Sequence, residues 1–131
     1  MELFYKKERD RDFFEACESV RKEFGAGYIS VSDIAKKAIH KEAKSFYLDT
    51  REYVKIAYKV GKENDLTWLK QKDKKELYLE IYKRYMQIFA KNPKLNRMDI
   101  ARIIAEQKAP RFYISEVSAS NLYYKLLKNR P

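Results

Sequence analysis

The 131-residue chain has the composition of an ordered, helix-rich protein, with 45% hydrophobic and 37% charged residues and only three glycines and three prolines. This balance excludes the disordered class of sequences. The single cysteine, Cys17, excludes an internal disulfide. No apolar run approaches the roughly 18 residues of a membrane-spanning helix. The N-terminal segment lacks the apolar core of a signal peptide, so we expect a cytoplasmic protein without membrane contact.

The net charge of +10 lies almost entirely in the second half of the chain. Residues 1–65 hold 14 Lys/Arg and 13 Asp/Glu, whereas residues 66–131 hold 15 and 6. A positive field of this kind attracts nucleic acid, acidic protein surfaces or anionic lipid. The alternative is a basic protein that is simply soluble and has no anionic partner.

The first half of the chain predicts three helices. Apolar residues at positions 13, 17, 20 and 24 have helical spacing, which indicates a helix from Asp10 to Phe24 that ends at the glycines 25 and 27. The stretch "SDIAKKAIHKEA" predicts a second helix, and a third is expected to begin at Asp49-Thr50, since Asp is a good N-cap. The positions expected to be buried on the second and third helices are Ile34, Ala35, Ala38, Ile39, Tyr53, Ile56, Ala57 and Val60. Residues 61–65, "GKEND", are the expected hinge.

The second half repeats this order. A helix is predicted from about Asp73 to Ala90, with Asp73 and Glu76 at the spacing of a capping box and Asn92-Pro93 as its end. The stretch "MDIARIIAEQKA" predicts the next helix, which Pro110 prevents from continuing. The last helix is expected to begin at Ser115-Glu116. The positions expected to be buried on these two helices are Ile100, Ala101, Ile104, either Ala105 or Ile103, and Ala119, Leu122, Tyr123 and Leu126.

An aromatic phrase between the second and third helices occurs twice, as "FYLD" at residues 46–49 and "FYIS" at residues 112–115. An offset of 66 also matches Asp-Ile-Ala at 33–35 with 99–101, Ala43 with Ala109, and Tyr58 with Tyr124. Upstream, one inserted residue shifts the offset to 65. We therefore predict an all-α protein of two tandem three-helix units, residues 1–65 and 66–131, packed as one compact body. Phe46 and Phe112 are expected to be buried wedges that fix the angle between the second and third helices of each unit.

Catalytic motifs are missing from the sequence. His40 is the only histidine and has no neighbouring ligand or carboxylate cluster, so we interpret it as a surface residue. Cys17 lies on an apolar stripe and is expected to be a core side chain. Glycine occurs only at positions 25, 27 and 61, which excludes a glycine-rich phosphate loop. We predict a protein that is not an enzyme and that uses neither metal nor cofactor.

Each unit resembles a helix-turn-helix over residues 33–60 and 99–127, where a helix beginning Asp-Ile-Ala precedes one capped by Asp-Thr or Ser-Glu. In that family the later helix enters the major groove, so the resemblance implies binding of duplex DNA. The connector is longer than the family's turn of about three or four residues, and it is aromatic and free of glycine.

The basic second unit carries the expected contacts. Asn suits a bidentate contact with adenine, whereas Ser, Lys and Arg suit phosphate or guanine. The predicted nucleic-acid-binding residues are Arg97, Arg102, Arg111, Ser118, Asn121, Lys125 and Lys128. In the first unit Arg51, Lys55 and Lys59 predict a weaker contact, because Glu52 stands beside them and the charge of that half is balanced.

Three other interpretations of these surfaces stay open. The charged residues are also typical of ordinary solvated helix faces. Aromatic rings among Lys and Arg can stack single-stranded bases, although most of the eleven tyrosines fall on predicted apolar stripes. A duplicated helical adaptor or scaffold that binds a protein is the alternative function. Its exposed aromatic surface would consist of Tyr5, Tyr28, Trp68 and Tyr124.

Overall fold

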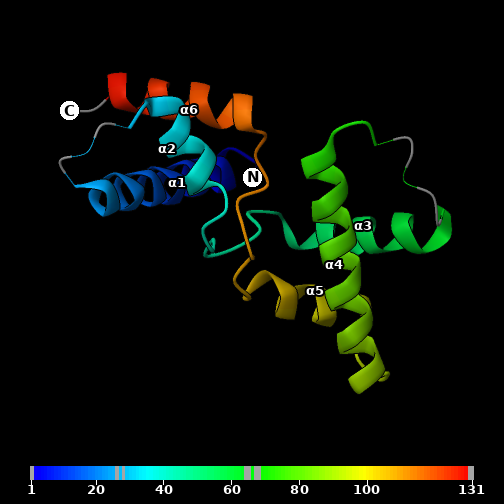
Figure 1. Ribbon diagram of the computed structural model, residues 1–131. Coiled ribbons are helices and arrows are strands. Elements are labelled where there is room, and N and C mark those ends of the chain that lie inside the picture. Colours follow the sequence, from blue (N-terminus) through cyan, green and yellow to red (C-terminus); the bar gives the residue numbers. More distant parts are fainter. Residues whose placement is uncertain (1, 26, 28, 64–65, 67–68, 130–131) are drawn as a thin grey trace.

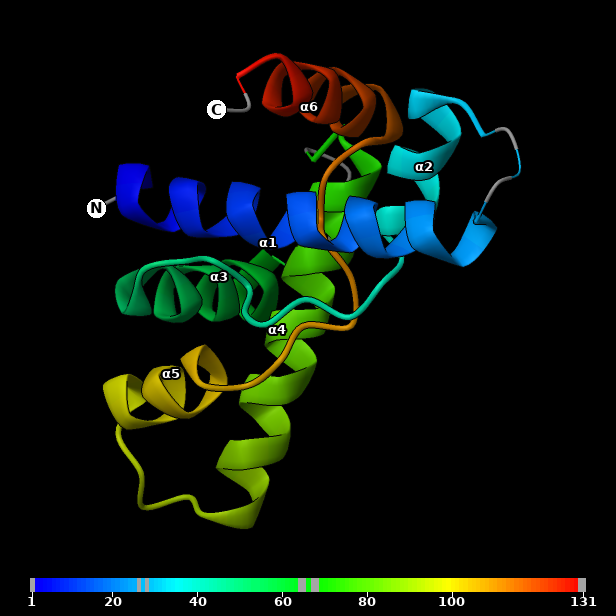
Figure 2. The same cartoon turned by 90° about the vertical axis from the view of Figure 1, so that its left-hand side faces the viewer.

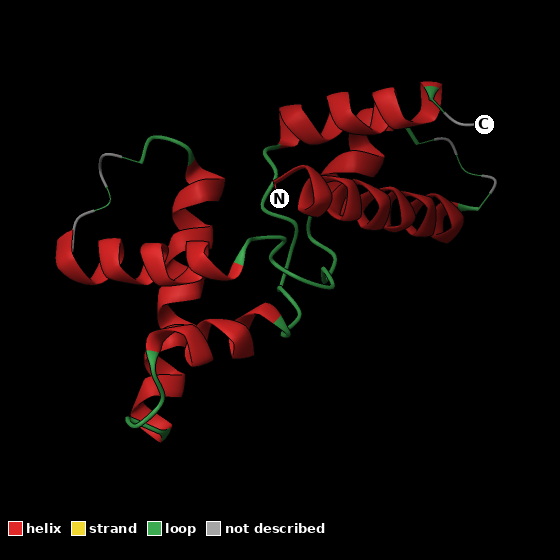
Figure 3. Cartoon of the chain, turned by 180° about the vertical axis from the view of Figure 1, so that it is seen from behind, coloured by secondary structure: helices red, strands yellow, loops and turns green. Residues whose placement is uncertain are grey.

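The protein is all-α in a computed structural model that describes residues 2–25, 27, 29–63, 66 and 69–129 (Figures 1 and 3). No strand occurs among these residues. The six helices are α1 (Glu2–Phe24), α2 (Val31–Ala38), α3 (Thr50–Glu63), α4 (Lys72–Lys91), α5 (Arg97–Ala105) and α6 (Glu116–Lys128). No helix in the described part of the chain is long and apolar enough to cross a membrane.

The helices pack as two groups of three that do not follow the sequence order. Helices α1, α2 and α6 form one group, the first bundle, and α3, α4 and α5 form the other, the second bundle (Figure 1). Each third helix has therefore crossed to the other unit: α3 packs on α4 and α5, and α6 packs on α2 and α1. The second bundle is one continuous segment, whereas the first is assembled from the two end regions of the chain.

The wedge expectation for Phe46 and Phe112 is wrong in one respect. Both rings are buried, but no Cα of α2 lies within 8 Å of one in α3, and the same holds for α5 and α6, in the part of the chain that the structure describes. The rings therefore cannot set an angle between helices that do not meet. They lie instead on the two connectors, residues 39–49 and 106–115, which run alongside each other between the bundles (Figure 2).

The connectors pair through residues that the predicted repeat makes equivalent. Ala43 and Ala109 form an antiparallel bridge in which each backbone N–H donates to the carbonyl of the other, both at 2.9 Å. The ring of Phe46 stacks on that of Tyr113, and Tyr47 stacks on Phe112, each at 6.1 Å between centroids. Such reciprocal contacts are the pattern of a two-fold interface.

Side-chain volumes favour the exchange of the third helices. In the first bundle the fully buried Tyr123 packs against Phe14, with ring centroids 5.9 Å apart, and its hydroxyl donates to Glu18 at 3.0 Å. In the second bundle the large residue is Tyr82 of α4. Its ring packs closely on Gly61 of α3, since a Cβ added to Gly61 would lie 3.3 Å from it.

Packing each third helix within its own sequence unit would mismatch these volumes. The alignment of the predicted repeat matches Tyr82 with Cys17 and Tyr123 with Ala57. Without the exchange, Ala57 and Gly61 would face Cys17 and leave a void, while Tyr123 would collide with Tyr82. Voids and overpacking in a core each cost several kcal/mol, about 2 to 5 for a large truncation and about 1 to 3 for an insertion. The exchanged arrangement avoids both.

Most expected core positions are confirmed. Ile34, Ala35, Ala38, Ile39, Tyr53, Ile56, Ala57, Val60, Ile100, Ala101, Ile104, Ala119 and Tyr123 are all buried. Of the two positions left open on α5, Ala105 is half-buried and Ile103 is exposed. Leu122 and Leu126 are also half-buried. The predicted caps hold, since the Ser115 hydroxyl accepts from the amide of Ser118 at 3.2 Å and Asp49 Oδ1 accepts from that of Arg51 at 3.1 Å.

Three local predictions are wrong. α1 begins at Glu2 rather than Asp10, because the Lys, Arg and Glu residues before Asp10 favour helix. α4 is preceded by Gln71 without a side-chain cap, since Asp73 and Glu76 pair with Arg111 instead of forming a capping box. Gly61 lies within α3 and is not a hinge. Residues 64 and 65 of the expected hinge lie outside the described residues.

Replacing Tyr123 by Ala should lower the free energy of unfolding by about 3 to 5 kcal/mol, because it opens a cavity between α6 and α1. The matched control is Tyr124→Ala, whose ring is 56% exposed and which should change that free energy by less than about 0.5 kcal/mol. Urea denaturation measures both.

A double-mutant cycle between Phe14 and Tyr123 should show coupling, whereas one between Tyr82 and Tyr123 should be additive. The opposite pattern would contradict the helix exchange.

Candidate nucleic-acid interface

The outer face of α6 brings together four of the predicted contacts. Ala119 and Tyr123 turn inward, which leaves the other side of the helix in solvent. The exposed residues on it, at spacings of three and four, are Ser118, Asn121, Lys125 and Lys128. Such spacing places side chains on one helix face. The Lys128 ammonium lies over the ring of Tyr124, 5.3 Å from its centroid.

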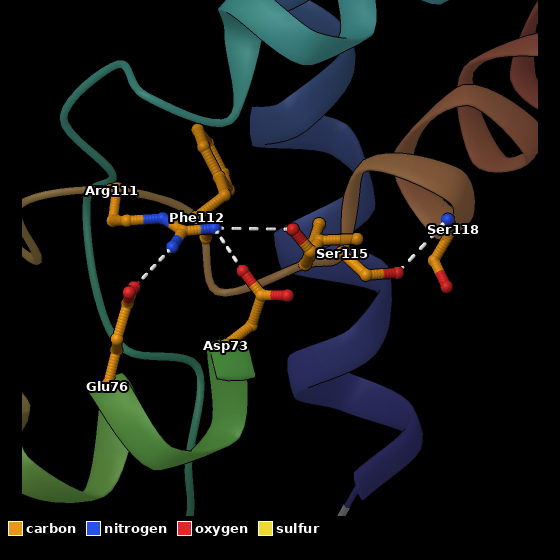
Figure 4. Close-up of polar contacts among 7 residues, drawn as sticks. Asp73, Glu76, Arg111, Phe112, Ser115 and Ser118 are labelled. Carbon is orange, nitrogen blue, oxygen red and sulfur yellow. Dashed lines mark hydrogen bonds and ion pairs between the residues drawn. The ribbon is translucent and has the colours of Figure 1, made fainter. Parts of the chain in front are cut away.

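Arg111 has a structural role instead of the predicted phosphate contact. Its guanidinium donates to Asp73 and Glu76, both at 2.7 Å (Figure 4). It also donates to the carbonyls of Phe112 at 3.0 Å and Ile114 at 3.3 Å. With its side chain 15% exposed and four acceptors around it, Arg111 ties the second connector to the first turn of α4. It has little donor capacity left for a phosphate, and we remove it from the interface.

Arg97 and Arg102 lie far from α6 along the fold. Both are on α5, in the second bundle, and α5 has no Cα within 8 Å of α6 in the described residues. Arg102 pairs with Asp99 on its own helix at 3.1 Å, in an exposed position. Arg97 borders a pocket between α3, α4 and α5. The structure therefore divides the predicted set between the bundles, because the third helices are exchanged.

The exchange also relocates the positive charge. Helices α3, α4 and α5 carry 12 Lys/Arg and 6 Asp/Glu, whereas α1, α2 and α6 carry 10 and 9. Of the 15 Lys/Arg in the second half of the sequence, eight lie on α4 and α5 and only two on α6. Helix α3 packs on these two helices, while α6 packs on a nearly neutral pair. The bundle that contains α3 therefore has the larger excess of positive charge on its helices.

The outer face of α3 carries a stripe of exposed cations. Its members recur every three to four residues along about three turns of helix: Arg51, Lys55, Lys59 and Lys62. Lys55 lies 3.8 Å from Glu52, an exposed pair that contributes little. Tyr58 is 60% exposed, with the Lys62 ammonium 5.6 Å from its ring centroid.

The exposed Tyr–Lys pair occurs in both third helices. Tyr58 and Lys62 match Tyr124 and Lys128 at the offset of 66, and each pair has the ammonium over the ring. Core packing does not explain these tyrosines, because more than half of each is exposed. The sequence already contained an indication of these exposed pairs, in the form of two aligned Tyr-x-x-x-Lys spacings. Of the other aromatic residues suggested for an adaptor surface, Tyr28 and Trp68 lie outside the described residues, and Tyr5 is half-buried.

The only histidine and the only cysteine of the chain lie in different surroundings. His40 is exposed at the end of α2, as expected. Cys17 is fully buried, and burial raises the pKa of its thiol to about 12. No group of three or more His, Cys, Asp or Glu that could hold a metal occurs in the described part of the chain.

Asp12 is the buried acid of the first bundle. It accepts a hydrogen bond from the hydroxyl of Tyr47 at 2.7 Å, and the Lys44 ammonium lies 3.6 Å away. Burial, followed by the bond to Asp12, raises the pKa of Tyr47. Tyr47 has a backbone φ of 60°, in the left-handed region that costs a non-glycine residue about 1 kcal/mol. The contact with Asp12 and the stacking on Phe112 hold it there.

Comparison of the chain with protein-family models found no match, and neither did comparison with curated proteins or with solved structures.

Arg111→Ala should lower the free energy of unfolding by about 2 to 3 kcal/mol, because it leaves the carboxylate of Asp73, 17% exposed, without its charged partner. Arg102→Ala is the control, since it removes an exposed pair worth at most about 1 kcal/mol. Chemical denaturation measures both. Equal effects of the two variants would contradict the structural role of Arg111.

The thiol of Cys17 should react with a disulfide reagent at pH 9 far more slowly in the folded protein than in urea. At that pH a free thiol is substantially ionised, but burial keeps this one protonated. The raised pKa also means that folding stability falls as the pH rises from about 9 toward 12, because the unfolded chain loses this proton first. A folded-state reaction as fast as that of free cysteine would contradict the burial of Cys17.

Proposed function

We propose that the protein binds duplex DNA without catalysing a reaction, chiefly through the outer face of α3. The observation that carries this proposal is the stripe of four exposed cations on α3, on the bundle with the excess of positive charge. Phosphate contacts from Lys and Arg supply most of the affinity of a protein for DNA. A helix face with cations on consecutive turns suits a groove bordered by phosphates on both sides.

The packing of α3 on α5 supports a helix-turn-helix manner of binding. In that family a short helix crosses the DNA backbone, and the helix packed against it enters the major groove. Here the pair is formed by exchange, so the long aromatic connector does not have to make the tight turn of the family. Arg51 suits a bidentate contact with guanine, and the lysines suit phosphate.

The outer face of α6 is the second contact surface of the proposal. Asn121 suits adenine, and Ser118, Lys125 and Lys128 suit phosphate. Because α6 lies on the nearly neutral first bundle, its contribution to affinity is the smaller one. This reverses the ranking expected from the sequence halves, and the reason is the exchange of α3 and α6.

Binding of a fluorescent generic duplex should weaken linearly on logarithmic axes as salt rises. If the three lysines of the α3 stripe contact phosphates, the slope is about −2.7, since each neutralised phosphate contributes about −0.9. Fluorescence anisotropy at several salt concentrations measures it. The absence of binding at low salt would refute the proposal and favour a protein partner.

Charge reversal distinguishes the two helices. Lys55→Glu with Lys62→Glu should weaken duplex binding strongly and reduce the salt slope by about two. The matched control, Lys125→Glu with Lys128→Glu, exchanges the same number of charges on α6 and should weaken binding less. Circular dichroism checks that both variants remain helical. A larger loss in the control would assign the main contact to α6.

A further inference from the structure

A pocket of about 360 Å³ lies between α3, α4 and α5, next to the cation stripe, with which it shares Lys62. This volume is within the range of small-molecule sites, about 300 to 1,000 Å³. Its walls are mostly aromatic and apolar, formed by Tyr58, Tyr82, Tyr85 and Met86. Ala57 and Gly61 of α3 complete the lining. The pocket therefore presents ring faces and edges to whatever enters it.

The pocket exists because α3 has small residues where α6 has large ones. The positions equivalent to Ala57 and Gly61 are Tyr123 and Leu127, and Tyr123 is fully buried against α1. A glycine within a helix costs about 1 kcal/mol relative to alanine. At position 61 a larger residue would be crowded, because the Tyr82 ring approaches the glycine closely. In the first bundle Tyr123 fills the corresponding space, whereas in the second the Tyr82 ring approaches Gly61 and both residues line the pocket.

The charge of the pocket selects the ligand. Its only charged lining residues are Lys62 and Arg97, both cations and both exposed. Neither forms an ion pair with a carboxylate in the described part of the chain. Lys62 lies over the ring of Tyr58, which places positive charge beside an aromatic wall. An anionic group on a flat ring would satisfy both features at once.

We propose that this pocket binds a planar aromatic group that carries a negative charge, of the chemical class of a nucleotide base with its phosphate. The base stacks on the tyrosine rings, and the phosphate accepts hydrogen bonds from Arg97 and Lys62. Two sources share this chemistry: a free nucleoside monophosphate and an unpaired nucleotide within a single strand. Lys62 is shared with the α3 stripe, but Arg97 and the pocket walls on α4 lie outside it, so the site does not rest on duplex binding.

The test uses the full chain with adenosine monophosphate, adenosine and a short oligothymidylate as probes. Amide NMR spectra should show adenosine monophosphate shifting the signals of Gly61 and Tyr58, and adenosine should bind about tenfold more weakly because it lacks the phosphate. If only the oligonucleotide binds, the source is a single strand. If the free nucleotide also binds, the strand is not required. No shift of these signals by any probe at millimolar concentration overturns the proposal.

Two matched pairs of variants locate the site without disturbing the core. Arg97→Glu should weaken binding of the monophosphate at least about tenfold, whereas Arg102→Glu on the same helix should not. Tyr58→Ala should also weaken it, whereas Tyr124→Ala, its equivalent on α6, should not. Equal losses within either pair would show general charge or aromatic contact and overturn the assigned pocket. Arg97→Glu should leave the salt slope of duplex binding nearly unchanged, which separates this site from the proposed function.

Discussion

The antiparallel pairing of Ala43 with Ala109 is the interaction on which the arrangement of the whole molecule depends. It brings the two connectors together at their equivalent points, and the rings of Phe46, Tyr47, Phe112 and Tyr113 stack reciprocally around it. From this crossing each connector leads its third helix away from the unit that precedes it. Neither sequence unit is therefore a closed structure, since each needs the other to cover its apolar faces.

The exchange decides which surface is positive. Sequence halves are the natural unit for counting charge, but the field around a helix comes from the helices packed beside it. Packing α3 on α4 and α5 places a helix from the balanced half of the sequence in the bundle with the larger excess of cations. The same exchange explains the lining of the pocket, because it brings the small residues Ala57 and Gly61 of α3 beside the tyrosines of α4.

The sequence was informative wherever the signal is local. Apolar spacing predicted that Ile34, Ile100 and Tyr123 are buried, and the cap at Ser115 followed from residue type. Periodicity shows that a face is buried but not which helix covers it, so the exchange was missed. Arg111 was misassigned for the same reason, because its partners Asp73 and Glu76 are more than 30 residues away along the chain. The complementary volumes of Cys17 and Tyr123 were a usable signal, but only after the repeat had been aligned.

The continuity of the second bundle has a consequence for how the chain acquires its structure. Residues 50–105 carry all three of its helices, so this bundle closes through short loops that cost little chain entropy. The first bundle must join α2 to α6 across the entire intervening segment, a closure that is slower because it is less local. We expect that, in a chain made from its N-terminus, α1 and α2 pack on each other first and are covered by α6 only after the last helix has been made. The packing of α3 on α5 holds one end of each connector near the other, and we expect this to reduce the chain entropy lost when α6 closes the first bundle.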